Sequence, residues 1–369
     1  MRDILISTVG TSLKGNILHG EEILRNLYEK ENAKGVAVEL CKLSSDDRIC
    51  GAEINSINSI IDKGYLASNE HLKLFVSDTP EGRFIGEILS HYFKRAGRNT
   101  SFVNVQLSVV EGLTDLEPHR FKNEGLRNLV RLISETVRQY GSKRILINAT
   151  GGYKAQISFA GMIGQALEIP VCYLFERFSE VIILPPQPVS FDLDFWLKNA
   201  DLFFELEHGI ITTARLELDD ERFATLIEEL EEDREHMTSL SPTGQLFHES
   251  FRYHFSRQKA TLLPRPSDLS DERRLIKFED KNRGKHRGLD AYLKKILESP
   301  YVNRIYTHYY NPSLSRSNIF KHSSKGVPGQ VEGWFGNGGG LTKFDVVTTS
   351  LTEEELQACI ADLNNRFLD

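Results

Sequence analysis

The sequence has few cysteines and no long apolar run, and both shortages narrow what the protein can be. Its four cysteines, Cys41, Cys50, Cys172 and Cys359, are scattered through 369 residues and form no Cys-x-x-Cys pair. This scatter disfavours a disulfide framework and a zinc knuckle, and it fits a reducing compartment. No apolar run approaches the roughly 20 residues that span a bilayer, and the opening MRDILISTVGTSL has early polar breaks. We therefore expect a cytoplasmic protein that is neither exported nor bound to a membrane.

The chain is long enough for more than one domain, and its charge is unevenly spread. Its 369 residues, 40% hydrophobic and 26% charged, are typical of a folded protein with several modest cores. Residues 265–325 hold 14 Lys and Arg against 7 Asp and Glu, whereas residues 217–235 hold 10 acidic residues against Arg222 and Arg234. The basic stretch predicts a surface that attracts a polyanion, although a solvated face of mixed charge has the same composition.

The first half of the sequence alternates apolar, β-rich runs with amphipathic helical segments. ILISTVGTSL reads as a buried strand that runs into a turn, and EEILRNLYEKE after it has helical spacing. The same order recurs through KRILINATGGYKAQISFAGMIGQAL and ends near the prolines of residues 185–188. This alternation predicts an α/β domain over residues 1–190, with a mostly parallel, Rossmann-like sheet covered by helices on both faces.

Two further regions follow this domain. Residues 191–262 are acidic and helical in character, with ERFATLIEELEED as the clearest amphipathic stretch, and predict a small helical or winged-helix connector. The proline-containing LLPRPSDLSDE reads as a linker. Residues 263–369 then alternate strand-like segments (RRLIKFEDK, VNRIYTHYY, NIFKHSS, QVEGWF, LTKFDVVTTS) with helices (LDAYLKKILES, and TEEELQACIADLNNRF with a Thr cap). They predict a small α+β domain with an antiparallel sheet.

Two glycine-containing loops are candidates for an anion-binding site. The first, TVGTSL, follows the first strand, and the second, NATGGYK, follows RILI and opens a helix. In a parallel sheet both loops lie at carboxyl strand ends, where ligands bind. Backbone N–H groups, hydroxyls and a lysine suit the phosphates of a nucleotide, although neither loop matches G-x-G-x-x-G or Walker A. The candidate binding residues are Gly10, Thr11, Ser12, Asn148, Thr150, Gly151, Gly152, Tyr153 and Lys154.

The ISTVGTSL opening and the NATGGYKAQ loop resemble the two ligand loops of the CRISPR-associated Rossmann-fold (CARF) sensors. The resemblance covers about residues 1–190 and implies a homodimer with one two-fold pocket for a cyclic oligoadenylate, most often cyclic tetra-adenylate. It also implies slow cleavage of the ring in some members, with Ser12 and Lys154 where those relatives orient the ribose 2′-OH and stabilise charge on the phosphate. We expect no cofactor beyond this activating ligand.

The basic C-terminal domain resembles the RelE type of mRNA interferase, an effector known in CARF proteins. The resemblance implies a metal-independent endoribonuclease of type III CRISPR antiviral defence that cleaves mRNA on the ribosome and arrests translation. Such cleavage needs cations around the phosphate, a proton acceptor for the 2′-OH and a donor to the 5′-oxygen. The candidate catalytic residues are Arg304, His308, Arg316, Lys321, His322 and Lys325, and the candidate base-stacking residues are Tyr306, Tyr309 and Tyr310.

Three alternatives remain open from the sequence. Arg316 and His322 also fit the R-x4-6-H pattern of the all-helical HEPN ribonucleases, which would act on free RNA, although strand-like residues surround the pair. A restriction-type nuclease would hold a metal on Glu332, Lys343 and Asp345, but their spacing is unconvincing and we expect no metal. A ligand-responsive transcription regulator would bind DNA through residues 217–255, which are acidic where a recognition helix is basic.

Overall fold

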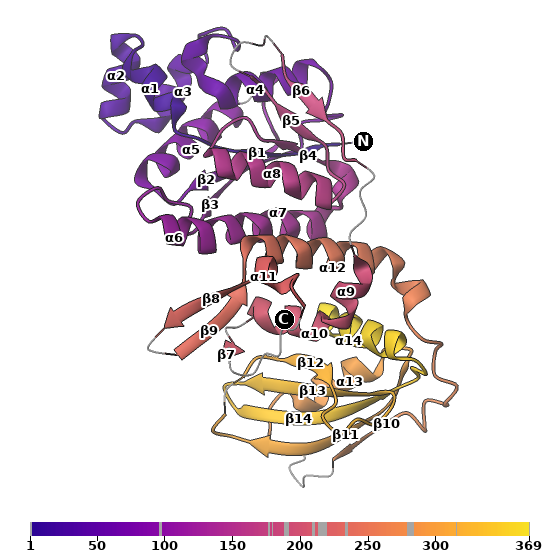
Figure 1. Ribbon diagram of the computed structural model, residues 1–369. Coiled ribbons are helices and arrows are strands. Elements are labelled where there is room, and N and C mark those ends of the chain that lie inside the picture. Colours follow the sequence, from indigo (N-terminus) through magenta and orange to yellow (C-terminus); the bar gives the residue numbers. More distant parts are fainter. Residues whose placement is uncertain are drawn as a thin grey trace. The chain divides into compact units, whose positions relative to one another are not determined.

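The computed structural model describes residues 2–95, 98–175, 178, 180–187, 192–208, 211–212, 220–232, 235–278, 284–314 and 316–368 (Figure 1). Its contacts divide the chain into two compact units. The N-terminal unit comprises Met1–Ser190 with Ser241–Ser250, and the C-terminal unit comprises Phe191–Leu240 with Phe251–Asp369. The expected boundary between residues 190 and 191 lies outside the described residues. Residues of the predicted connector, 191–262, contribute to both units. Within the described ranges, every helix is too short or too polar to cross a bilayer.

The N-terminal unit is built on a six-stranded sheet with the order β3-β2-β1-β4-β5-β6. The strands are β1 (Ile4–Thr8), β2 (His71–Ser77), β3 (Asn104–Val110), β4 (Ile145–Asn148), β5 (Val171–Tyr173) and β6 (Ile182–Leu184). All neighbouring pairs are parallel except β5 and β6, which are antiparallel. The mostly parallel sheet predicted from the apolar runs is therefore confirmed.

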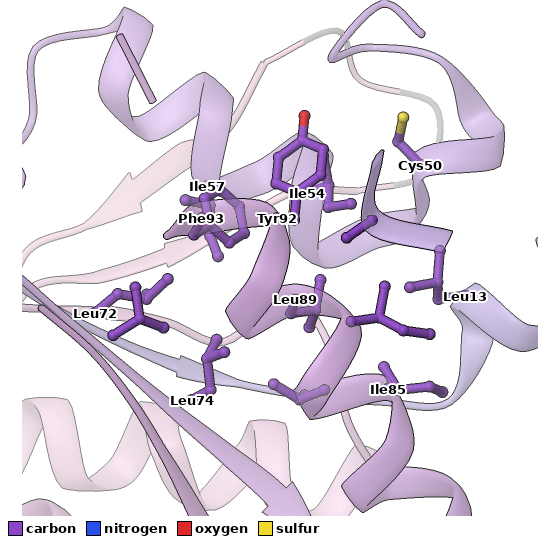
Figure 2. Packing of buried hydrophobic residues seen from close by; sticks show 14 of the residues in the cluster. Leu13, Cys50, Ile54, Ile57, Leu72, Leu74, Ile85, Leu89, Tyr92 and Phe93 are labelled. Carbon is purple, nitrogen blue, oxygen red and sulfur yellow. The ribbon is translucent and has the colours of Figure 1, made fainter. Parts of the chain in front are cut away.

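Helices cover both faces of this sheet, which explains why its central strands β1 and β4 are buried along their whole length (Figure 1). They are α1 (Ser12–Leu18), α2 (Glu22–Glu29), α3 (Ala33–Leu40), α4 (Gly51–Asp62), α5 (Pro80–Phe93), α6 (Pro118–Arg120), α7 (Arg127–Tyr140) and α8 (Lys154–Ala166). Short helical turns occupy Arg48–Cys50, Phe121–Leu126 and Ser142–Arg144. Figure 2 shows Ile54 and Ile57 of α4 and Leu89 of α5 packed with Leu72 and Leu74 of β2, all fully buried. Helices α7 and α8 contact the sheet through β1, β3 and β5.

The C-terminal unit contains a five-stranded sheet with the order β10-β11-β14-β13-β12. The strands are β10 (Leu275–Phe278), β11 (Val302–Asn311), β12 (Ile319–His322), β13 (Gln330–Asn337) and β14 (Gly340–Thr348). Its neighbours are antiparallel except β10 and β11, which are parallel, so the predicted antiparallel sheet is a mixed one. Helices α13 (Leu289–Leu297) and α14 (Glu353–Phe367) supply Leu293 and Ile360 to a core with Ile305 and Phe344. As predicted, the Thr352 side chain caps α14 by accepting a hydrogen bond from the Glu355 amide.

The remaining elements include one clear departure from the sequence prediction. They are α9 (Leu193–Lys198), α10 (Ala200–His208), β7 (Ile211–Thr212), α11 (Phe223–Leu226), β8 (Ile227–Glu232), β9 (Glu235–Leu240) and α12 (Pro242–Leu262). The prediction of a helix over ERFATLIEELEED is wrong. Helix α11 ends at Leu226, and the residues after it form strand β8. Strand β8 pairs antiparallel with β9, which places Leu230 opposite Met237. Cross-strand pairing thus overrides the helix propensity of the glutamates.

Candidate functional site

The two predicted ligand loops lie side by side at the carboxyl edge of the N-terminal sheet. Strands β1 and β4 pair in parallel, with Ser7 opposite Asn148, so the loops after them leave the same edge. Their backbones approach closely, because a Cβ added at Gly10 would lie 2.6 Å from the amide nitrogen of Gly152. Gly152 also has φ of 116°, a conformation that favours glycine. The glycines therefore permit the contact between the loops.

A buried carboxylate from α4 lies against both loops. The Gly10 N–H donates a hydrogen bond of 2.7 Å to Oε1 of Glu53. A Cβ added at Gly151 would come within 1.9 Å of the same oxygen. Glu53 is fully buried, and burial raises the pKa of its carboxyl above the ordinary value, opposed by the hydrogen bond from Gly10. Glu53 was not among the predicted site residues, because its only signal in the sequence is that of an acidic residue in the first turn of a helix.

Two of the residues predicted to bind the ligand, Asn148 and Thr150, support the second loop from inside. Asn148 is buried, and its Nδ2 donates to the hydroxyls of Ser7 (3.1 Å) and Ser56 (2.8 Å). Its Oδ1 accepts the Thr150 hydroxyl at 2.6 Å, and the Thr150 oxygen accepts the Leu174 N–H at 3.0 Å. These hydrogen bonds fix the path of the loop as it leaves β4.

The remaining polar side chains of the two loops are accessible. Thr11 and Ser12 are exposed where α1 begins, and Lys154 is exposed as the first residue of α8. Tyr153 is half-buried, its ring 5.2 Å from that of Phe121 in an edge-on contact, and burial raises the pKa of its hydroxyl. The loops therefore offer two hydroxyls and one ammonium, which are donors suited to a phosphodiester.

The same edge carries two arginines that no sequence motif indicated. Asp78, which follows β2, accepts hydrogen bonds from Arg83 (2.7 Å) and from the Gly112 N–H (3.1 Å), and it lies 3.6 Å from Arg120. The Gly112 amide and the two guanidinium groups hold the pKa of Asp78 below its usual range. Asp78 thereby ties the loops after β2 and β3 together beside the glycine loops. Because the two arginines lie far apart in the sequence, only the fold relates them.

The C-terminal sheet has a second candidate site on the face opposite α13 and α14. Cross-strand pairing aligns Lys321, Glu332, Asp345 and Tyr306 in one row across β12, β13, β14 and β11. Glu332 and Asp345 are buried carboxylates. Lys325 Nζ lies 2.6 Å from Asp345 Oδ2. His308 adjoins a bulge in β11, with Nε2 3.5 Å from Asp345 Oδ1.

Lys321 of this row and three residues of the neighbouring row, Trp334, Lys343 and Tyr309, form a stack of cations and aromatic rings. Lys321 Nζ and Lys343 Nζ lie 3.9 Å and 4.4 Å from the ring centroid of Trp334. Lys343 Nζ is also 5.7 Å from the Tyr309 ring, and the Trp334 indole N–H donates to Glu332 Oε1 at 2.6 Å. We call Tyr309, Lys321, Trp334 and Lys343 the cationic face. Within the part of the chain that the structure describes, neither lysine makes an ion pair, so both are available to a polyanion.

Trp334 was missed by the sequence analysis, and Lys343 was considered only for a metal. The glycine-rich turn between β13 and β14 was the signal in the sequence that could have identified them. Asn337 pairs with Gly340 beside this turn, and three residues further along each strand Trp334 pairs with Lys343. The position of the turn therefore fixes which residues of the two strands face each other.

The predicted catalytic residues do not all come together. His308, Lys321 and Lys325 lie around Glu332 and Asp345, and Arg304 is half-buried on β11 opposite Val347. His322 lies on the other face, because it pairs with the core residue Val331, and its Nδ1 is 3.5 Å from Glu353 of α14. Arg316 is exposed in the segment before β12. Adjacent residues on a strand point to opposite faces, so Lys321 and His322 are separated.

Two sequence alternatives are affected by this geometry. The HEPN alternative is contradicted, because Arg316 precedes a strand and His322 ends it, whereas that pattern requires the start of a helix. Glu332, Lys343 and Asp345 do lie on paired strands of one face. Among the described residues, however, there is no group of three or more His, Cys, Asp or Glu placed to hold a metal ion.

Comparison with known proteins places part of the chain in a CRISPR context. Residues 48–187 match a family described as CRISPR-associated protein (Cas_APE2256), which is less than half of the chain. No curated protein matches it significantly. Among solved structures, Can2 from Sulfobacillus thermosulfidooxidans in complex with cyclic tetra-adenylate aligns with 14% identity over 73% of this chain and 69% of that chain, with a TM-score of 0.24. Protein VC1899 from Vibrio cholerae aligns with 8% identity over 94% and 77%, with a TM-score of 0.27.

The contact between the loops predicts a difference between two glycine substitutions. Gly10→Ala places a methyl group against the backbone of Gly152, so we expect the free energy of unfolding to fall by about 1–3 kcal/mol. Gly15→Ala is the control, because no atom lies within 4 Å of its added Cβ and alanine favours the helix. Urea denaturation of both variants measures the difference. Equal stability of the two would show that the loops are not in contact.

The burial of Glu53 predicts a dependence of stability on pH. Its folded pKa lies above the ordinary value of 4.5, so at pH values between 4.5 and the folded pKa unfolding releases the Glu53 proton. The stabilising contribution of the neutral acid is therefore complete below pH 4.5 and is lost as the pH rises through the folded pKa. Thermal denaturation across this range should show a shallower loss of stability in Glu53→Gln than in the wild type. Parallel curves for the two proteins would contradict the expectation.

Proposed function

We propose that the protein is a cyclic-oligoadenylate-activated ribonuclease of CRISPR antiviral defence, with a ligand-sensing N-terminal unit and an RNA-cleaving C-terminal unit. The observation that carries the proposal is the contact between the two glycine loops at the carboxyl edge of the sheet, with Ser12 and Lys154 exposed there. The match of residues 48–187 to a CRISPR-associated family includes the second of these loops and supports the same context.

The chemistry of the loops suits the proposed ligand, cyclic tetra-adenylate. Each of its phosphodiesters carries one negative charge, which Lys154 balances while the hydroxyls of Thr11 and Ser12 donate hydrogen bonds. A ring with two-fold symmetry matches two copies of this edge, so we propose a homodimer. Ser12 and Lys154 are also the groups that would orient a ribose 2′-OH and stabilise the phosphate during slow cleavage of the ring.

The C-terminal unit would supply the effector chemistry, in the manner of RelE. The cationic face offers Lys321 and Lys343 to the RNA backbone and Trp334 to a base. His308 beside Asp345 is placed to exchange protons with the 2′-OH or the leaving 5′-oxygen, without a metal ion. The proposed substrate is mRNA on the ribosome, and the outcome is translation arrest. By linkage, the ligand activates only as far as it binds the active arrangement more tightly than the inactive one.

The transcription-regulator alternative has less support. Its proposed DNA-binding segment, residues 217–255, includes the glutamate-rich strand β8 instead of a basic recognition helix. These glutamates would repel the phosphates of a DNA duplex, because both carry negative charge.

The proposal is tested by RNA cleavage in the presence of EDTA. Free RNA and translating ribosomes are each incubated with the purified protein, with and without cyclic tetra-adenylate, and the ligand is afterwards analysed for ring opening. We expect ligand-dependent cleavage of ribosome-bound mRNA.

Lys154→Ala should weaken binding of the ligand about 10–100-fold, because a charge-assisted hydrogen bond contributes about 1.5–3 kcal/mol. Lys143→Ala is the matched control, an exposed lysine that precedes β4 at the opposite edge of the sheet. Equal rates of cleavage with and without cyclic tetra-adenylate, on both free RNA and ribosomes, would contradict the sensor assignment.

The cationic face generates a separate expectation for RNA. Replacing Lys321 and Lys343 together by alanine should lower kcat/KM for RNA about 10–100-fold and reduce its salt dependence, since two phosphate contacts are lost. Lys295→Ala is the control, because this exposed lysine lies on α13, which covers the other face of the sheet. The measurement is the initial rate of cleavage at several salt concentrations. The same loss of rate in both proteins would show that the lysines act through overall charge and that the face is not the RNA site.

A further inference from the structure

The carboxyl group of Glu53 lies against both ligand loops. It belongs to the first turn of α4 and is fully buried. Its Oε1 accepts the Gly10 N–H at 2.7 Å and lies directly against the Cα of Gly151, where a Cβ would be 1.9 Å away. One carboxylate oxygen therefore touches the backbone of the first loop and of the second.

The second oxygen of this carboxyl group is left without a partner. Among the described residues, Oε2 of Glu53 is buried and makes no hydrogen bond. A buried polar atom without a partner is unfavourable, and a purely structural site would be more stable with a smaller or apolar side chain there. Among the described residues, the hydrogen bond that this carboxyl group makes to another residue goes to a ligand loop.

The contact has a directional consequence for the first loop. With the Gly10 N–H turned inward to Glu53, this amide is not available to a phosphate. The next two residues, Thr11 and Ser12, are then the first exposed donors of the loop. Ser56, one turn further along α4, accepts a hydrogen bond from Asn148 and so supports the start of the second loop. Helix α4 thus contacts the first loop through Glu53 and the second loop through both Glu53 and Ser56.

We propose that Glu53 is a positioning residue that holds the β1–α1 and β4–α8 loops together, so that Ser12 and Lys154 are presented to one ligand. The identity of the ligand in this inference rests on the proposed function. The role of Glu53 in holding the two loops together does not depend on it. The side chain acts through Gly10 and Gly151 and makes no contact with the ligand itself.

The test compares three variants on α4 by two measurements. Glu53→Ala removes the acceptor, whereas Glu53→Gln keeps an oxygen able to accept the Gly10 N–H. Ile60→Ala is the control for lost stability, because Ile60 is a fully buried core residue two turns further along the helix. Hydrogen exchange is followed in the unliganded full-length protein for peptides that span residues 9–12 and 149–154, and binding of cyclic tetra-adenylate is measured by titration.

We expect Glu53→Ala to speed exchange about 10-fold or more in both peptides and to weaken binding about 10-fold or more. Glu53→Gln should remain within about 3-fold of the wild type in both measurements, and Ile60→Ala should leave binding within the same limit. Unchanged exchange in Glu53→Ala, or an equal loss of binding in Ile60→Ala, would overturn the inference. If the wild type does not bind cyclic tetra-adenylate, the proposed function fails, and the exchange data alone decide whether Glu53 positions the loops.

Discussion

The parallel pairing of β1 with β4 is the constraint on which the N-terminal site depends. It brings two loops more than a hundred residues apart to one edge of the sheet, where a side chain at Gly10 would clash with the backbone of Gly152. The side chains around them divide into two sets. Glu53 and Asn148 face inward and hold the loops, whereas Ser12 and Lys154 are exposed. Rigid support beneath exposed donors is the arrangement that a preorganised anion site requires.

The C-terminal site is arranged differently, around buried carboxylates and not around glycine. Asp345 and Glu332 lie opposite one another on paired strands, where like charges would repel. Lys325 and the Trp334 indole N–H each bind one of them, which offsets this repulsion and fixes the direction of both partners. The lysines on either side of Trp334 remain without ion pairs among the described residues. The acidic groups thus order a surface whose accessible charge is positive.

The sequence predicted the fold class better than it predicted the details of the sites. Apolar runs and helical spacing were sufficient for the parallel sheet, and β-branched alternation was sufficient for β11 to β14. The glutamates of β8 were misassigned because their pairing with β9 is not visible in local propensity. The polar residues after β4 could be placed at the right edge, but whether Asn148 faces inward depends on Ser56 of a distant helix. His322 was grouped with Lys321 as a candidate catalytic residue, although strand alternation separates the two side chains.

The composition of the cationic face has an optical consequence. The chain contains two tryptophans, and both belong to the C-terminal unit. Trp196 is fully buried among Phe204, Phe251 and Phe255, whereas Trp334 is partly exposed between two ammonium groups. The fluorescence of the protein is therefore the sum of emission from the buried Trp196 and from the partly exposed Trp334. A base stacked on Trp334, or a displaced lysine, changes the polarity around that indole. The protein carries an intrinsic fluorophore at its proposed RNA site and an internal reference in the same unit.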